Sequence, residues 1–174
     1  RSFRPRGHTA SYGEISPAGL AELLDLCSPG PGDVFCDLGS GVGRAVLQAH
    51  LCSPVRRAVG VELARARHER AALALRRLRA ARLGDDGRQV RFLHGDFLRA
   101  PLPAASIFYV ASLAFREGVV AGLAQKLGRE APPGAAAFVM RELSGPEASG
   151  LRLRGELHVP CPRNDIFSAC SWSP

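Results

Sequence analysis

The chain has 174 residues, of which 46% are hydrophobic and 22% are charged, as is typical of one globular domain with a buried core. No apolar run approaches the roughly 18 residues of a membrane span, so we expect no membrane-spanning helix in this sequence. The net charge of +7 comes mostly from arginine and leaves two interpretations open, a solvated basic surface or contact with nucleic acid or a nucleosome.

The first residue and the cysteines indicate the context of the chain. The sequence begins with Arg1 rather than methionine, so we expect a segment of a longer protein. The five cysteines are odd in number and form no C-x-x-C pair, which favours free thiols in a reducing compartment over disulfides or a zinc site. We therefore expect an intracellular protein without a bound metal.

Hydrophobic periodicity predicts helices and strands in alternation after a basic, flexible lead-in at residues 1–11. The first helix has Ser16 as its cap and Pro17 in its first turn. The expected helices lie at 16–27, 44–52, 64–83 and 117–127. The expected strands lie at 33–38, 58–63, 89–96, 105–113, 132–140, 151–160 and 165–172.

This order of elements predicts the fold class. Alternating strands and helices favour a mostly parallel sheet with helices on both faces, and the last two strands favour an antiparallel addition at one side. The sequence contains no repeat and no linker, so we expect a single domain over residues 1–174. The longest flexible connection, at 143–150, is of the kind that often lies over a site.

A glycine-rich turn marks a candidate binding site. The stretch DLGSGVG, residues 37–43, joins a buried strand to a helix and has the spacing G-x-G-x-G. Such a turn lets a ligand approach the backbone, and ligands of open α/β sheets bind at the carboxyl ends of the strands. Because the spacing differs from the dinucleotide pattern G-x-G-x-x-G, it favours a nucleoside ligand without a pyrophosphate.

Acidic residues end the next two strands. Glu62 follows the glycines by about 20 residues, where an acid can accept from both hydroxyls of a ribose. Asp96 ends the third strand and could accept from an adenine amino group, with Phe97 stacking on the ring. The alternative is that Glu62 and Asp96 only cap the segments that follow them.

These features together resemble the class I S-adenosylmethionine-dependent methyltransferases over nearly the whole chain. The resemblance implies a Rossmann-like fold with a seven-stranded, mostly parallel sheet, a C-terminal antiparallel hairpin and S-adenosylmethionine as cofactor. It places Glu62 at the ribose, with Asp96 and Phe97 at the adenine. The residues implied near the methionine end are Asp37, Gly39, Ser40, Gly41 and Gly43.

Three segments are similar to a narrower family, the disruptor-of-telomeric-silencing histone lysine methyltransferases. They are YGEIS (12–16), DLGSGVGRAVLQ (37–48), and GDFL (95–98) with SIFYVASLAF (106–115). The resemblance implies that Tyr12 and Glu14 cover the methionine part of the cofactor, Tyr12 also serving the catalytic end. The family carries two asparagines before Phe-Ala-Phe, whereas this chain has Ala111 and Ser112 there. Ser112 could supply a smaller polar group at the methyl-transfer end, and Phe115 could line the lysine channel.

The resemblance implies a lysine N-methyltransferase that acts on a protein, with a histone or nucleosome as the preferred substrate. It also implies contact with DNA or RNA through the arginine-rich surface, no membrane association, and a nuclear location if the substrate is a histone. Two alternatives stay open. One is a cytoplasmic or nuclear class I methyltransferase for a non-histone protein, RNA or a small molecule, and the other is a non-catalytic module that only binds the cofactor.

Overall fold

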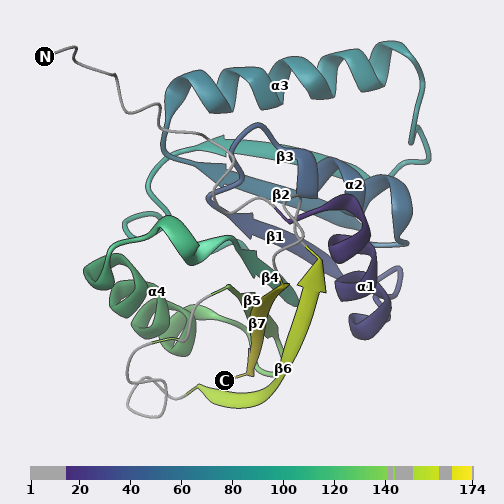
Figure 1. Cartoon of the computed structure of the whole chain (residues 1–174). Coiled ribbons are helices and arrows are strands. Elements are labelled where there is room, and N and C mark those ends of the chain that lie inside the picture. Colours follow the sequence, from purple (N-terminus) through teal and green to yellow (C-terminus); the bar gives the residue numbers. More distant parts are fainter. Residues whose placement is uncertain (1–14, 141–142, 144–150, 161–165, 174) are drawn as a thin grey trace, which may run out of the picture.

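A computed structural model of residues 1–174 gives the structure of the chain (Figure 1). It describes residues 15–140, 143, 151–160 and 166–173. The predicted lead-in at 1–11 and most of the predicted connection at 143–150 lie outside the described residues. The helices are α1 (Pro17–Cys27), α2 (Arg44–Cys52), α3 (Arg65–Ala80), the short 3₁₀ helix η1 (Ser112–Ala114) and α4 (Glu117–Glu130). The strands are β1 (Val34–Leu38), β2 (Arg57–Glu62), β3 (Gln89–His94), β4 (Ile107–Val110), β5 (Ala136–Val139), β6 (Arg152–Pro160) and β7 (Ile166–Ser173).

The described strands form one sheet in the order β3-β2-β1-β4-β5-β7-β6. The first five strands in this order pair in parallel, whereas β7 pairs antiparallel with both β5 and β6. The chain runs outward from β1 through β2 to β3, and then returns to the other side of β1 as β4. The carboxyl ends of β1 and β4 therefore meet where the strand order reverses, which is where open α/β sheets bind ligands.

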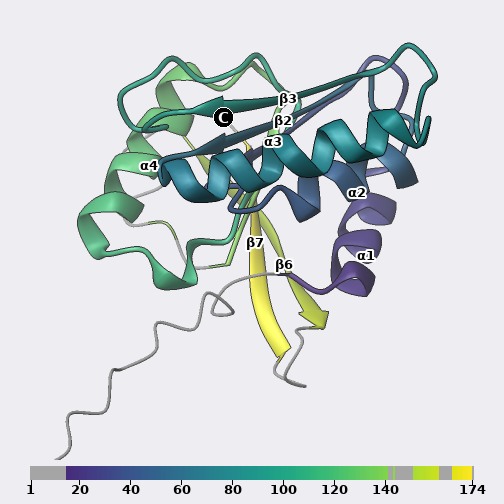
Figure 2. The ribbon, with the colours of Figure 1, turned by 90° about the horizontal axis from the view of Figure 1, so that it is seen from above.

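The sheet is covered by helices on both faces, as Figures 1 and 2 show. Alternate residues of β1 point to opposite faces, so that Phe35 packs with α1 and α2 while Cys36 and Leu38 pack with α4. The α4 side contributes Val120, Leu123, Ala124 and Leu127 to its core. The predicted Rossmann-like arrangement, a parallel sheet with helices on both faces, is confirmed.

The ends of the elements have local causes. Ser16 caps α1 as predicted, because its hydroxyl accepts a hydrogen bond from the Gly19 amide at 3.0 Å. The strand predicted at 105–113 is shorter than expected, since β4 ends at Val110 and the 3₁₀ turn begins at Ser112. Because the strand is short, residues 111–115 lie beyond its carboxyl end rather than within the sheet. Among the described residues, no helix combines the length and apolar character that crossing a membrane requires.

Candidate functional site

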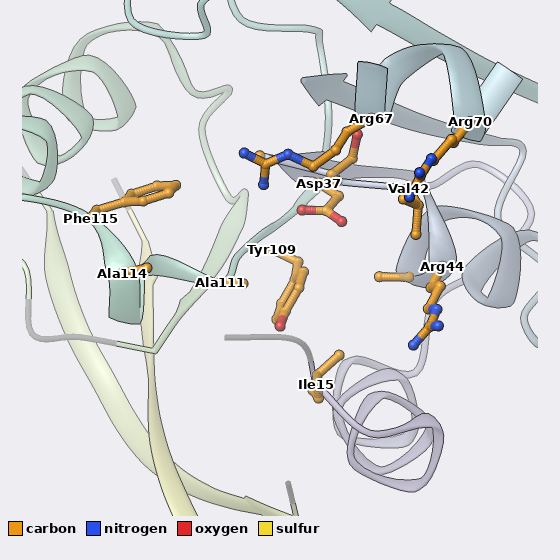
Figure 3. Close-up of a pocket in the computed structure, with 14 residues that line it drawn as sticks. Ile15, Asp37, Val42, Arg44, Arg67, Arg70, Tyr109, Ala111, Ala114 and Phe115 are labelled. Carbon is orange, nitrogen blue, oxygen red and sulfur yellow. The ribbon is translucent and has the colours of Figure 1, made fainter. Parts of the chain in front are cut away.

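A cleft of about 180 Å³ opens at the carboxyl ends of β1 and β4 (Figure 3). Its wall comes from the glycine loop after β1, the first turns of α2 and α3, the end of β4 and the segment that follows β4. The lining residues are Ile15, Asp37, Gly39, Ser40, Gly41, Val42, Arg44, Ala45, Arg67, Arg70, Tyr109, Ala111, Ala114 and Phe115. The cleft thus lies where the strand order reverses and contains the glycine loop that the sequence singles out.

Backbone hydrogen bonds hold the glycine loop against β2. The amides of Gly39 and Ser40 both donate to the Val61 carbonyl, at 2.8 and 3.0 Å, and the Gly43 amide donates to the Ser40 carbonyl at 2.8 Å. Phe115 packs over the loop, because a Cβ on Gly39 would lie 3.2 Å from Phe115 Cζ. These contacts give the loop one shape, so that a ligand meets a surface that is already formed.

Glu62 ends β2 as predicted, and its carboxylate is buried behind the glycine loop. Its Oε2 accepts from the Gly41 amide at 2.8 Å and its Oε1 accepts from the Ala64 amide at 2.7 Å. Arg67 adds an ion pair, with Nε 3.7 Å from Oε1. Glu62 therefore joins the glycine loop to the start of α3, although it is not part of the cleft wall.

Two further predicted residues, Asp37 and Ser40, line the cleft and are both buried. The Ser40 hydroxyl oxygen is buried and has no hydrogen-bond partner within the described part of the chain. Gly43, by contrast, caps the start of α2 and faces Phe92 rather than the cleft. The cleft thus has a polar floor at β1, with the glycine loop beside it.

The predicted adenine residues follow β3 beside the cleft. Asp96 accepts from the Leu98 amide at 2.9 Å and forms an ion pair with Arg99 at 3.5 Å. Phe97 stacks on Phe115 with 5.8 Å between the ring centroids. In this arrangement Asp96 shapes the turn after β3, and Phe97 reaches the cleft only through Phe115, which lines it.

The predicted catalytic residues differ in whether they reach the cleft. Phe115 lines the cleft, whereas Ser112 is fully buried in η1 and is not part of the wall. The Ser112 hydroxyl finds no hydrogen-bond partner among the residues that the structure describes. Tyr12 and Glu14 lie outside the described residues. The roles of all these residues stay predictions.

Several residues of the wall are not predicted by any sequence pattern. Tyr109 points into the cleft from β4, and its hydroxyl lies 3.7 Å from the Met140 sulfur. Arg67 and Arg70 reach the cleft from the first turns of α3, and Arg44 does so from the start of α2. Arginines are so frequent in this chain that none stood out by composition. Their position at the starts of the helices that follow β1 and β2 was the available signal. Within the described residues, no cluster of three His, Cys, Asp or Glu side chains could hold a metal.

Comparison with known proteins finds similarity over the part of the chain that forms the cleft. The family model described as "Histone methylation protein DOT1" matches residues 4–129. A curated protein of Caenorhabditis elegans named "Histone-lysine N-methyltransferase, H3 lysine-79 specific" is 42% identical over 53 residues, which is 30% of this chain and 6% of that protein. A protein of the same name from Eremothecium gossypii is 50% identical over 40 residues, which is 23% of this chain and 7% of that protein. The matched stretches are therefore a small part of those relatives.

Solved structures agree on the fold. An RNA methyltransferase from Salinibacter ruber, solved in complex with S-adenosyl-L-homocysteine, superposes with a TM-score of 0.68. The superposition covers 88% of each chain at 21% sequence identity. At that identity the likeness shows the fold alone, which is the Rossmann-like fold of S-adenosylmethionine-dependent methyltransferases.

Proposed function

Because this chain belongs to the family of the histone methylation protein DOT1, we propose that it is a single catalytic domain of a histone lysine N-methyltransferase that uses S-adenosylmethionine. The observation that carries the proposal is the family match over residues 4–129, which spans the glycine loop, Glu62, Asp96 and Phe115. The curated relatives are named for lysine 79 of histone H3, so histone H3 is the proposed substrate and the nucleus is the proposed location.

The residues of the cleft fit the cofactor. Asp37 and Ser40 are buried polar residues of the cleft wall, and the Gly41 backbone has open space where a Cβ would point. A nucleoside with an amino-acid tail needs such polar and close backbone contacts. We propose that Asp37, Gly39, Ser40 and Gly41 hold the methionine end.

The remaining cofactor contacts are proposed from the sequence. Glu62 would hold the ribose, and Asp96 and Phe97 the adenine. Gly43 would act by fixing the start of α2. Tyr12 and Glu14 would cover the methionine part. When bound, S-adenosylmethionine supplies a methyl group on a sulfonium, and the protein must align it with the lysine nitrogen.

The chain must also favour the neutral form of the substrate lysine. With an ordinary pKa of about 10.4, deprotonation at pH 7 costs roughly 4.6 kcal/mol. An apolar channel lowers a lysine pKa by desolvation, since burial disfavours the charged form. Ala111, Ala114 and Phe115 give one side of the cleft this apolar character, and Ser112 is proposed as the polar group beside it.

We further propose that α3 contacts nucleic acid. The helix carries six arginines and one glutamate, and the only residues it buries are Ala71 and Leu75. The arginines are Arg65, Arg67, Arg70, Arg76, Arg77 and Arg79. An exposed basic face of this kind fits the phosphate backbone of nucleosomal DNA, whose contacts are mainly electrostatic.

The test of the proposed function is methyl transfer from tritiated S-adenosylmethionine to nucleosomes, free histone H3 and total RNA. Label should enter H3. Gly41→Arg should abolish transfer without unfolding the protein, because the new side chain extends into open space in the cleft. Gly87→Arg is the matched control, since Gly87 also has positive φ and open space but lies outside the cleft wall. Label in RNA alone, or equal loss in both variants, would contradict the proposal.

A further inference from the structure

We propose that Arg67 competes with the cofactor ribose for the Glu62 carboxylate and so sets the affinity of the cleft for its cofactor. This inference rests on the proposed function, because it takes the cleft as a nucleoside site. It concerns a residue that the glycine-loop pattern does not include.

Glu62 contacts two residues of the cleft wall, Gly41 and Arg67, without belonging to the wall itself. The Glu62 side chain is only 6% exposed, and its two oxygens already accept from the Gly41 and Ala64 amides. Gly41 and Arg67 belong to the cleft wall, whereas Glu62 does not. A carboxylate has about four acceptor positions, so two remain for further donors. The Arg67 guanidinium stands on the Oε1 side of that carboxylate, where ribose hydroxyls would donate.

The Arg67 side chain can be displaced from Glu62. Its Nε lies 3.7 Å from Glu62 Oε1, which is longer than the usual 2.7–3.2 Å of a hydrogen bond. The Arg67 side chain is 56% exposed, and Figure 3 shows it reaching over the cleft from α3. At this distance, and with more than half of its side chain exposed, Arg67 is held only loosely by the ion pair. Arg67 therefore reduces affinity rather than closing the cleft.

Another arginine of α3 provides a matched control for the loss of charge at Arg67. Arg65 lies two residues earlier on α3 and pairs with Glu69 at 2.9 Å. Its side chain is 81% exposed and it is not part of the cleft wall. Arg65→Gln therefore removes the same charge from the same helix turn and leaves the Arg67–Glu62 pair in place.

The experiment measures the dissociation constant of S-adenosylhomocysteine by isothermal titration calorimetry. This probe has the ribose but no sulfonium charge, so general repulsion by arginines contributes little. Arg67→Gln should bind it about fivefold more tightly than the wild type at low salt, and Arg65→Gln should stay within about twofold. Arg67→Lys should fall between wild type and Arg67→Gln, since a lysine keeps the charge but not the planar fork.

A double-mutant cycle assigns the effect to Glu62. In a Glu62→Gln background, Arg67→Gln should no longer tighten binding, because the competing pair is already broken. Equal or weaker binding by Arg67→Gln, or a gain that persists without Glu62, would overturn the competition while leaving the proposed function intact. If every variant is folded in thermal unfolding and none binds the probe, the proposed cofactor site fails and the inference fails with it.

Discussion

At the scale of single residues, Gly41 and Gly43 show that one loop motif serves two purposes. Both have positive φ, at +55° for Gly41 and +86° for Gly43. A Cβ on Gly43 would lie 2.4 Å from Phe92 Cζ and 3.0 Å from Ala71 Cβ, whereas one on Gly41 would meet no heavy atom within 4 Å. Gly43 is therefore required for packing of α2 against β3 and α3, and Gly41 for an open face at the cleft.

This difference predicts unequal stability losses for two alanine substitutions. Gly41→Ala should lower the free energy of unfolding by about 1–2 kcal/mol, which is the strain of the left-handed region. Gly43→Ala should lower it by about 2–5 kcal/mol, because overpacking against Phe92 adds about 1–3 kcal/mol to the same strain. Urea unfolding of both variants measures the two values. Equal losses would mean that Phe92 moves aside without cost.

At the scale of elements, Glu130 ties the end of α4 to the connection between β3 and β4. Its carboxylate accepts from Lys126 at 2.9 Å, from Arg129 at 3.0 Å and from the Leu102 amide at 3.1 Å. Lys126 is buried, and Glu130 is the carboxylate that it pairs with at 2.9 Å. The connection it holds also contains Asp96 and Phe97, the candidate adenine residues.

The Glu130 contacts predict a pH dependence of stability. Hydrogen bonds from Lys126 and Arg129 are the main reason that the pKa of Glu130 falls from its ordinary 4.5 to about 2. A lowered carboxyl pKa stabilises the folded state above the unfolded value, and this stabilisation is lost as pH falls from about 4.5 toward 2. Glu130→Gln should therefore unfold more easily than wild type at pH 7, with a difference that shrinks as pH falls through this window.

Urea unfolding of Glu130→Gln and wild type between pH 7 and pH 3 measures this difference. Glu22→Gln, which removes an exposed carboxylate from α1, is the control and should follow the wild-type curve. A Glu130→Gln difference that stays constant with pH would show that the loss comes from changed packing around Lys126 rather than from its charge pair.

At the scale of the whole molecule, sequence patterns predicted those structural features that depend on residues close together in the sequence. Ser16 as a cap, the glycine loop after β1 and Glu62 at the end of β2 were all predicted, because each depends on residues a few positions away. Arg67 and Tyr109 were missed, since their place in the cleft depends on how α3 and β4 sit around β1. Neither residue type marks such a position by itself.

The basic face of α3 carries the last prediction, which concerns binding of the whole domain to nucleic acid. Figure 1 shows α3 along the outer side of the sheet, and its arginines are exposed. Each neutralised phosphate contributes about 0.9 to the slope of log affinity against log salt on duplex DNA. Arg76→Gln combined with Arg77→Gln should therefore weaken binding to nucleosomes at low salt and reduce that slope by about 1.8.

The control for this prediction removes the same charge elsewhere. Arg56 precedes β2 and Arg116 precedes α4, and both are exposed and lie outside α3. Arg56→Gln combined with Arg116→Gln should leave the slope unchanged. The slope is measured by fluorescence anisotropy with labelled nucleosomes between about 50 and about 200 mM salt, a range over which the affinity of such contacts changes about tenfold or more. Equal slopes for the two double variants would show that net charge, rather than the α3 face, governs the attraction. A smaller slope for the α3 variant alone would locate the phosphate contacts on that helix, because the slope counts the phosphates that the lost charges neutralised.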